Sequence, residues 1–242
     1  MPPAVADLDL RDRTVVITGA FGALGAVVSQ SARAAGAAVA AVGRAPAAKV
    51  PPFGPGIVAF GGIDLAKPDE TAAGFQSIAD RLGSIDALVN IAGAFRFEKI
   101  VGGGIDAWDQ MYELNLRTTV NATRSALPFI LKRSAIHGAG RIVNIGAAAA
   151  VHASSGMGPY TASKAGVARF TEALSAELKD SGITANALLP SIIDTAPNRA
   201  DMPKADFSRW VKPEQLADLI VYLLSSRSGA ITGALIPVTG RV

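Results

Sequence analysis

The sequence predicts one α/β domain, built on a doubly wound parallel sheet of seven strands with helices on both faces. Strand-like and helix-like segments alternate from Thr14 to Val238, which is typical of consecutive βαβ units. The strand-like runs are continuously apolar rather than alternating, and this indicates burial on both faces of the sheet. No break in composition divides the 242 residues, so we assign residues 1–242 to a single domain.

Each element is assigned from its own pattern. Short apolar runs predict strands at Thr14–Thr18, Ala37–Val42, Ile57–Phe60, Ala87–Ile91, Arg141–Ile145, Thr184–Leu189 and Ala234–Val238. Longer periodic or alanine-rich segments predict helices at Leu24–Ala35, Asp69–Leu82, Asp106–Arg133, Gly158–Asp180 and Pro213–Ser225.

Two stretches fit neither pattern. Pro46–Gly56 is rich in proline and glycine and is predicted to be a surface loop. Ser191–Trp210 contains two prolines and no clear period. Loops of that length within a compact domain are often functional, so we expect a substrate lid at about residues 191–211.

Composition excludes several classes of function. The chain has no cysteine, so it has no disulfide, no thiol catalysis and no cysteine metal site. Neither His137 nor His152 stands in a cluster with carboxylates, so no metal is expected. The net charge is only +3 and the basic residues are scattered, which argues against nucleic acid as a partner.

Targeting and membrane signals are also missing from the sequence. No uninterrupted apolar run approaches the ~18–20 residues that a membrane span needs. The first ten residues lack the basic and then apolar pattern of a signal peptide. We therefore expect a cytoplasmic protein with a small-molecule substrate and no membrane partner.

The first predicted strand runs directly into a glycine-rich turn, Gly19-Ala20-Phe21-Gly22-Ala23-Leu24-Gly25. Glycines let the backbone turn sharply and approach a pyrophosphate, while the following helix directs its free N–H groups at that charge. At the first strand-to-helix turn of an alternating fold, the pattern predicts a dinucleotide-binding Rossmann fold. The expected contacts are Gly19, Phe21, Gly22, Ala23 and Leu24. The alternative is a tight turn without a ligand.

The residues after the second and third strands bear on the choice of dinucleotide. Sites for NAD commonly place a carboxylate near the end of the second strand, but here Gly43 and Arg44 follow it. Gly43 would leave room, and Arg44 could bond to a 2′-phosphate, which favours NADP(H) over NAD(H). Arg44 could equally be a solvated loop residue. Asp64, followed by Leu65, could accept a bond from an adenine amino group or cap the next helix.

Tyr160 and Lys164 stand four residues apart on a predicted helix and therefore share a face. An ammonium group nearby stabilises a phenolate and would lower the tyrosine pKa from ~10 towards neutrality. Tyr160 is thus a candidate general acid or base.

Taken together, these motifs resemble the short-chain dehydrogenase/reductase family along nearly the whole chain. The matching segments are Thr18-Gly19-x-x-Gly22-x-x-Gly25, Asp64-Leu65, Asn90-Ile91-Ala92-Gly93, Asn115, Tyr160-x-x-x-Lys164 and Ile231-Thr232-Gly233. The resemblance implies an NAD(P)-dependent oxidoreductase. By this resemblance, Tyr160 would exchange a proton with the substrate, Lys164 would hold the nicotinamide ribose and Asn115 would hold a relay water.

The same resemblance assigns further residues. Cofactor contacts would come from Asp64, Leu65, Asn90, Ala92, Gly93, Tyr160, Lys164, Pro190, Ile193 and Thr195, with Asn90 also stabilising the centre of the sheet. Substrate contacts would come from Phe95, Ala147 and Ser155. The two long helices would pair between subunits, giving a homotetramer or a homodimer.

The chain departs from the family pattern in three places. The glycines are spaced 19, 22 and 25 rather than as TGxxxGxG, and Ser191 follows Pro190 where glycine is common. Most important, the family usually has a serine thirteen residues before the tyrosine, where this chain has Ala147. Ser154 or Ser155 could supply the missing hydroxyl, or could cap the helix.

Within the family, the chain resembles the quinonoid dihydropteridine reductases most specifically. Those enzymes share the glycine-alanine-leucine-glycine loop, the alanine at 147 and a lid stretch similar to Asn198-Arg199, Met202-Pro203 and Trp210. They differ by favouring NADH through a carboxylate after the second strand, and by lacking the match to Asn115.

Three functions follow as hypotheses. The first is a reductase of a conjugated, pterin-like acceptor, and the second is a general carbonyl reductase or alcohol dehydrogenase. The third is an NADP-binding sensor or scaffold with little catalysis. Retention of Tyr160, Lys164 and Asn115 argues against the third.

Overall fold

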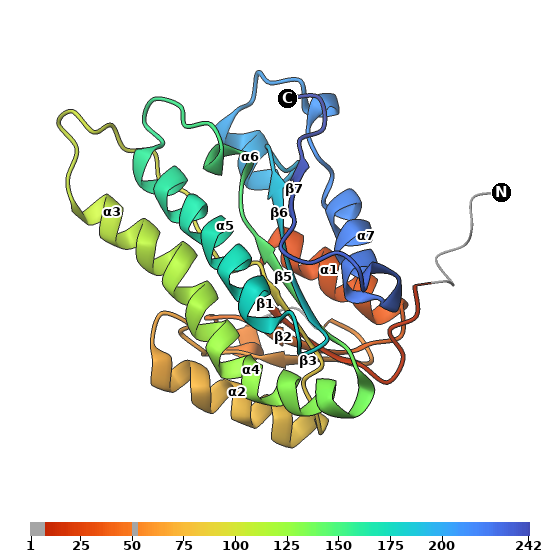
Figure 1. Ribbon diagram of the computed structural model, residues 1–242. Helices are drawn as coiled ribbons and strands as arrows, with labels where there is room; N and C mark the ends of the chain where they lie inside the picture. Colours follow the sequence, from red (N-terminus) through yellow and green to blue (C-terminus); the bar gives the residue numbers. More distant parts are fainter. Residues whose placement is uncertain (1–7, 50–52) are drawn as a thin grey trace.

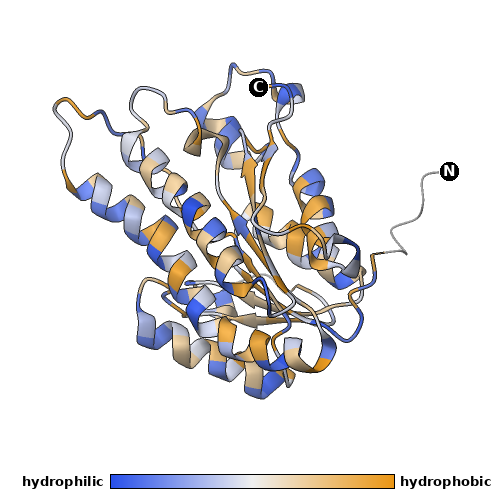
Figure 2. Cartoon of the chain, in the orientation of Figure 1, coloured by the Kyte–Doolittle hydropathy of each residue, from blue (hydrophilic) through white to orange (hydrophobic). Residues whose placement is uncertain are grey.

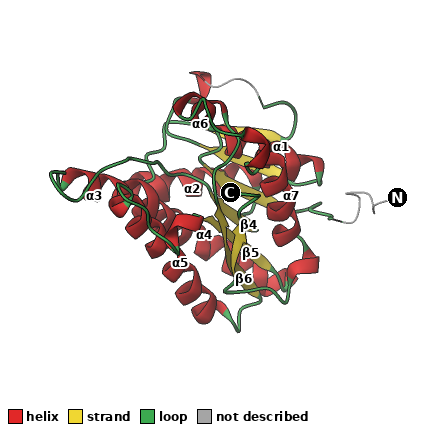
Figure 3. Cartoon of the chain, turned by 90° about the horizontal axis from the view of Figure 1, so that it is seen from above, coloured by secondary structure: helices red, strands yellow, loops and turns green. Residues whose placement is uncertain are grey.

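The computed structural model describes residues 8–49 and 53–242. Residues 1–7, part of the segment in which no signal peptide is expected, lie outside the described residues, as do residues 50–52 of the predicted loop Pro46–Gly56. Seven strands form one parallel sheet in the order β3-β2-β1-β4-β5-β6-β7. Helices cover both of its faces (Figures 1 and 3). The predicted doubly wound α/β fold is confirmed.

Most predicted elements occur, with ends within a few residues of expectation. The strands are β1 (Thr14–Thr18), β2 (Ala38–Val42), β3 (Ile57–Phe60), β4 (Ala87–Asn90), β5 (Gly140–Ile145), β6 (Ile183–Pro190) and β7 (Leu235–Val238). The α-helices are α1 (Ala23–Ala34), α2 (Pro68–Leu82), α3 (Asp106–Met111), α4 (Thr118–His137), α5 (Gly158–Leu178), α6 (Ala196–Asp201) and α7 (Pro213–Leu224). Within the two described ranges, none of the helices combines the length and the apolar character needed to cross a membrane.

Two of the predictions need correction. The helix predicted at Asp106–Arg133 is not one regular helix, because a π-helical segment, Tyr112–Arg117, separates α3 from α4. A single wide turn leaves the apolar pattern on either side almost unchanged, so periodicity does not reveal it. The connection Ser191–Trp210 is not irregular throughout, since it contains α6, whose N-cap Thr195 accepts a bond from the Asn198 N–H.

The sheet separates two apolar cores. Side chains of α1 and α7 pack on one face with Val15 and Ile17 of β1. On the other face, side chains of α2, α4 and α5 pack with Val16, which lies between Val15 and Ile17 in β1. Because successive strand residues point to opposite faces, both must be apolar when both faces are covered. Figure 2 shows the resulting apolar colouring along the centre of the molecule.

A buried carboxylate ties the amino ends of the central strands. Asp86 accepts hydrogen bonds from the Thr14 N–H at 2.9 Å, the Ser84 hydroxyl at 2.9 Å and Arg133 Nε at 2.7 Å. These partners belong to β1, the turn before β4, and α4. Asp86 therefore fixes these three segments together at the edge of the sheet opposite the glycine turn.

The three glycines of the turn after β1 meet different constraints. Gly19 has a left-handed φ of +65°, and a Cβ there would lie 2.7 Å from the Ala92 nitrogen. A Cβ on Gly25 would lie 2.3 Å from the Gly19 carbonyl oxygen. A Cβ on Gly22 would meet only that same oxygen, at 3.4 Å, and its φ of −88° suits any residue. Packing within the chain therefore requires Gly19 and Gly25 but not Gly22.

We predict that Gly25→Ala destabilises the protein by about 2–3 kcal/mol, because the new methyl group meets backbone that cannot move freely. Helix propensity alone predicts the opposite sign, a gain of about 0.5–1 kcal/mol. Gly22→Ala should cost no more than about 1 kcal/mol, the loss expected at an N-cap. Urea unfolding of both variants measures this difference. Equal stability of the two variants would contradict the packing argument.

Candidate active site

A cleft of about 500 Å³ lies at the carboxyl edge of the sheet, where β1 and β4 stand side by side. In a doubly wound sheet this is the switch point, at which the chain crosses to the opposite half and ligands bind. The lining residues are Gly19, Gly22, Ala23, Leu24, Gly25, Gly43, Arg44, Ile63, Asp64, Leu65, Ile91, Ala92, Gly93, Ala94, Leu114, Thr118, Thr195 and Pro197. Another cavity, of about 460 Å³ between α2 and α4, contains none of the predicted site residues.

The cleft gathers most of the residues that the sequence predicts for cofactor binding. Those that line it are Gly19, Gly22, Ala23, Leu24, Arg44, Asp64, Leu65, Ala92, Gly93 and Thr195, whereas Phe21, Asn90, Tyr160, Lys164, Pro190 and Ile193 do not. Sequence reasoning missed Leu114 and Thr118 in particular. These two flank Asn115 and are four residues apart, so the helical spacing around Asn115 was a signal that could have found them.

The expectation that Gly43 leaves room in the cleft is wrong. A Cβ on Gly43 would lie 2.3 Å from Cδ2 of the Phe21 ring. The space beside Gly43 is thus filled by a side chain from the glycine turn, and the contact joins two segments that are distant in the sequence.

Lys164 is buried at the junction of α5, β5 and the loop after β4. It is 5% exposed, and its Nζ donates a hydrogen bond of 2.8 Å to the Ile145 carbonyl. The same Nζ lies 3.4 Å from where a Cβ on Gly93 would stand, so it borders a cleft residue. Burial lowers the pKa of Lys164 to about 8, because desolvation penalises the charged ammonium.

Tyr160 lies one helical turn before Lys164, and its ring meets Phe95 edge to face, with centroids 5.0 Å apart. Burial raises the pKa of Tyr160 to about 12. The sequence predicts the opposite direction, on the ground that Lys164 stabilises a phenolate. In the protein alone desolvation outweighs that effect, so the phenol is held neutral.

Asn115 joins the two walls of the site. Its side chain accepts from the Ala94 N–H at 2.8 Å and donates to the Ala94 carbonyl at 3.0 Å and to the Ser163 hydroxyl at 3.0 Å. Its own carbonyl accepts from the Thr119 hydroxyl at 2.8 Å. Asn115, in the π-helical segment, therefore holds the loop after β4 against α5. Its role towards a relay water stays a prediction.

Asn90 faces the interior of the sheet. Its amide donates to Asn144 Oδ1 at 2.9 Å and to the Thr123 hydroxyl at 3.1 Å, which links β4 to β5 and α4. Asp64 accepts from the Ala66 N–H at 3.1 Å and lines the cleft, so its role towards an adenine stays a prediction. The alternative that Asp64 caps α2 is wrong, because the N-cap is Lys67 and no side chain caps that helix.

Two of the predicted substrate residues differ in exposure. Ala147 is 4% exposed and offers no hydroxyl, whereas Ser155 is exposed. The suggestion that Ser154 or Ser155 caps α5 is wrong, because the N-cap is Met157 and no side chain caps it. The helix instead begins with Gly158 and a proline at 159, whose fixed φ suits a first turn.

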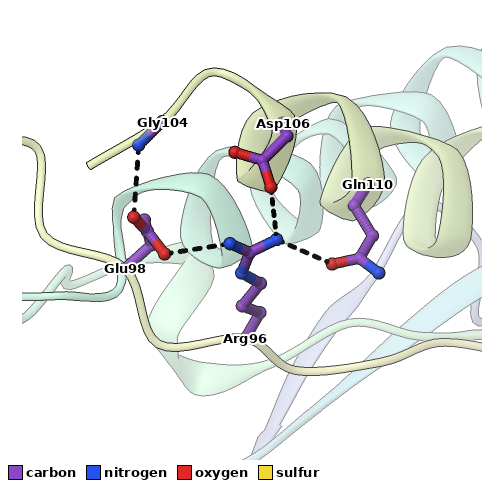
Figure 4. Close-up of polar contacts among 5 residues, drawn as sticks. All are labelled: Arg96, Glu98, Gly104, Asp106 and Gln110. Atoms are coloured by element: carbon purple, nitrogen blue, oxygen red, sulfur yellow. Dashed lines mark hydrogen bonds and ion pairs between the residues drawn. The ribbon is translucent and has the colours of Figure 1, made fainter.

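Phe95 starts an exposed arm, residues 95–105, that polar contacts hold in place (Figure 4). Arg96 donates to Asp106 at 2.8 Å, to Gln110 at 3.3 Å and to Glu98 at 3.3 Å. Glu98 in turn accepts from the Gly104 N–H at 3.2 Å. Exposed ion pairs contribute little singly, but this set connects both ends of the arm to α3.

The predicted lid is a folded segment. Arg199 forms a two-pronged ion pair with Asp194, and this hydrogen bonding holds the pKa of the Asp194 carboxyl below its ordinary value. The Arg199 guanidinium also lies over the Phe207 ring, 4.7 Å from its centroid, and Phe207 packs on Trp210 at 4.7 Å. Ile193 accepts from Asn198 Nδ2 at 2.8 Å, which fixes the start of α6 beside the end of β6 at Pro190.

In the ranges 8–49 and 53–242, no three His, Cys, Asp or Glu side chains gather as a metal site would require.

Comparison with known proteins agrees with this geometry. Residues 13–206 match the family model described as short chain dehydrogenase. D-beta-hydroxybutyrate dehydrogenase of Rhizobium meliloti is 29% identical over 94% of this chain and 97% of its own. The crystal structure of a gluconate 5-dehydrogenase from Burkholderia cenocepacia, in complex with NADP and tartrate, is 26% identical with a TM-score of 0.89 over 98% of this chain and 97% of that one.

A 3-ketoacyl-(acyl-carrier-protein) reductase from Brucella melitensis, complexed with NADH, is 25% identical with a TM-score of 0.85 over 96% of this chain and 98% of that one. The family match covers well over half of the chain and includes the glycine turn, Tyr160 and Lys164. This protein, an NAD(P)-dependent oxidoreductase, therefore belongs to the short chain dehydrogenase family.

Proposed function

We propose that the protein transfers a hydride between NADP(H) and a small organic substrate, with Tyr160 exchanging the accompanying proton. The observation that carries this proposal is the pair of half-buried Tyr160 and buried Lys164 on α5, of which Lys164 borders the cleft residue Gly93 at the switch point. Buried titratable groups with shifted pKa values at the edge of a cleft are typical of sites that move protons.

The residues of the cleft fit a nicotinamide dinucleotide. Gly22 has open space that its own chain does not need, directly at the first turn of α1. The first amides of α1 have no partner within the helix and suit a pyrophosphate. When bound, the nicotinamide supplies or accepts the hydride. Lys164, with one of its donors on Ile145, has others free to hold the ribose.

Tyr160 then handles the proton. In the reducing direction its hydroxyl gives the proton to the substrate atom that gains electrons, and the phenolate left behind is stabilised by the Lys164 ammonium. With a lysine pKa of about 8, that ammonium is mostly charged at neutral pH. Asn115 positions Tyr160 by holding α5 against the loop after β4.

Arg44 supports NADP(H) over NAD(H). It lines the adenosine end of the cleft, and it stands after β2 where NAD sites commonly carry a carboxylate. One of the two crystal structures compared above holds NADP and the other NADH, so the preference rests on Arg44 itself.

Ala147 favours a conjugated acceptor over a simple ketone. A carbonyl under reduction gathers negative charge on oxygen, and each donor directed at that oxygen supplies roughly 3 kcal/mol of stabilisation. Position 147 has no such donor, whereas a conjugated ring spreads the incoming charge and needs it less. The similarity to quinonoid dihydropteridine reductases rests on these residues alone. The relatives compared above are named for hydroxybutyrate, gluconate and 3-ketoacyl substrates, and they favour the second candidate, a carbonyl reductase.

Replacing Arg44 tests the cofactor. Arg44→Ala should weaken NADPH binding by roughly tenfold or more, because one charge-assisted hydrogen bond is lost. The affinity for NADH should be unchanged. Arg124→Ala, which removes an arginine from the cavity between α2 and α4, is the matched control. Dissociation constants for both cofactors are the measurement. Tighter binding of NADH than NADPH by the unmodified protein would refute the preference.

Two substitutions test the chemistry. Tyr160→Phe should lower kcat by about two to four orders of magnitude, because the phenol proton is lost. Ala147→Ser should raise kcat/KM for simple ketones more than for quinonoid dihydropterins, by up to roughly a hundredfold. Steady-state kinetics with NADPH on both substrate classes decides the outcome. If the unmodified enzyme prefers simple ketones by about tenfold or more, the carbonyl-reductase function replaces the conjugated one.

We also propose a homotetramer or homodimer formed through α4 and α5. Leu131 and Ile136 of α4 are 41% and 65% exposed, so apolar surface on this helix is available for a second chain. Light scattering at micromolar concentration should give two or four times the 24.7 kDa of one chain. Leu131→Asp with Ile136→Asp should reduce that mass. A purely monomeric mass for the unmodified protein would exclude the assembly.

A further inference from the structure

Phe21 brings three separate segments together at one end of the cleft. Its ring lies directly on Gly43, the residue after β2, with Cδ2, Cε2 and Cγ at 2.3, 2.6 and 2.7 Å from the position of a Cβ there. The ring also faces Phe53, from the loop before β3, with centroids 6.0 Å apart and planes tilted by 35°. The glycine turn, the end of β2 and that loop therefore meet at one aromatic pair.

The backbone does not explain why residue 43 is a glycine. Its φ is not among the positive values, and its N–H and carbonyl form ordinary bonds, to Phe60 at 3.1 Å and from Ile63 at 3.3 Å. Any residue could adopt this conformation. The three atoms nearest to a Cβ at this position all belong to the Phe21 ring, so positions 21 and 43 are sterically coupled.

Position 43 also borders the part of the cleft that would receive the adenosine ribose. Gly43 and Arg44 both line the cleft, and this is where a carboxylate holds the ribose hydroxyls in many NAD sites. With Phe21 seated on Gly43, a side chain on residue 43 has no path to the ribose. Arg44, the next residue, is left beside the 2′ position.

We infer that Phe21 is a specificity-determining residue for the adenosine half of the cofactor. Its ring occupies the space of a ribose-holding side chain at position 43. This inference rests on the proposed function. It means that Arg44 alone does not set the choice between NADP(H) and NAD(H), and that a carboxylate at 43 works only after Phe21 is removed.

The test is binding of two probes, 2′,5′-ADP and 5′-ADP, measured by isothermal titration calorimetry on the full chain. The proteins are the unmodified chain, Phe21→Ala, Gly43→Asp and the double variant. Phe97→Ala is the control, because it removes a half-exposed phenylalanine from the arm at residues 95–105. The melting temperature of every variant shows whether that variant is folded.

Phe21→Ala alone should leave the ratio of the two affinities unchanged, because it places no new group beside the 2′ position. Gly43→Asp alone should weaken both without favouring 5′-ADP. In the Phe21→Ala background, the same aspartate should shift the ratio of the two affinities towards 5′-ADP by at least about fivefold. If Gly43→Asp fails to fold alone but folds with Phe21→Ala, the steric coupling is equally supported.

Two results would overturn the inference while leaving the proposed function intact. One is a shift towards 5′-ADP from Gly43→Asp alone that equals the shift in the double variant. The other is a double variant whose ratio of affinities for the two probes equals that of the unmodified protein. Failure of the unmodified protein to bind either probe at millimolar concentration would instead remove the proposed function and this inference together.

Discussion

The close approach of β1 and β4 at their carboxyl ends is the constraint on which the site depends. The Thr18 hydroxyl accepts bonds from the N–H groups of Ile91 at 3.1 Å and Ala92 at 3.3 Å. Gly19 can follow because it has no Cβ to strike Ala92. One strand then leads into the glycine turn and α1, and the other into the loop that Asn115 holds against α5. The cleft and the pair Tyr160 and Lys164 are thus positioned from a single junction.

Burial, more than charge pairing, sets the state of the reacting groups. Lys164 and Tyr160 shift in opposite pKa directions, yet desolvation is the cause in both, because each group is pushed towards its neutral form. The phenol is consequently a poor acid until something further stabilises its anion. Lys164, with a pKa of about 8, is the cation nearest in sequence on the same helical face. The site in the protein alone holds a neutral tyrosine and a mostly charged lysine at neutral pH.

The sheet and many of the cleft residues could be predicted from the sequence, because both depend on patterns among neighbouring residues. Strands buried on two faces carry consecutive apolar residues, as in Val15-Val16-Ile17 of β1, and the turn after β1 carries its glycines in order. Contacts between segments that are distant in the sequence have no such local pattern. Nothing near Gly43 in the sequence points to Phe21, and nothing in the spacing of Asp106–Arg133 reveals the wide turn at Tyr112–Arg117. The sign of the Tyr160 pKa shift was missed for the same reason, since burial depends on the whole fold.

If the space beside Gly22 at the first turn of α1 receives a nicotinamide dinucleotide, NADPH should bind there. Titration of the protein with NADPH, followed by nicotinamide fluorescence, tests this when the unmodified chain is compared with Gly22→Ala. We expect saturable binding of one nucleotide per chain, weakened by about tenfold or more in Gly22→Ala, because the new methyl group meets the ligand rather than the protein. The absence of saturable binding, or equal affinity in a folded Gly22→Ala, would contradict it.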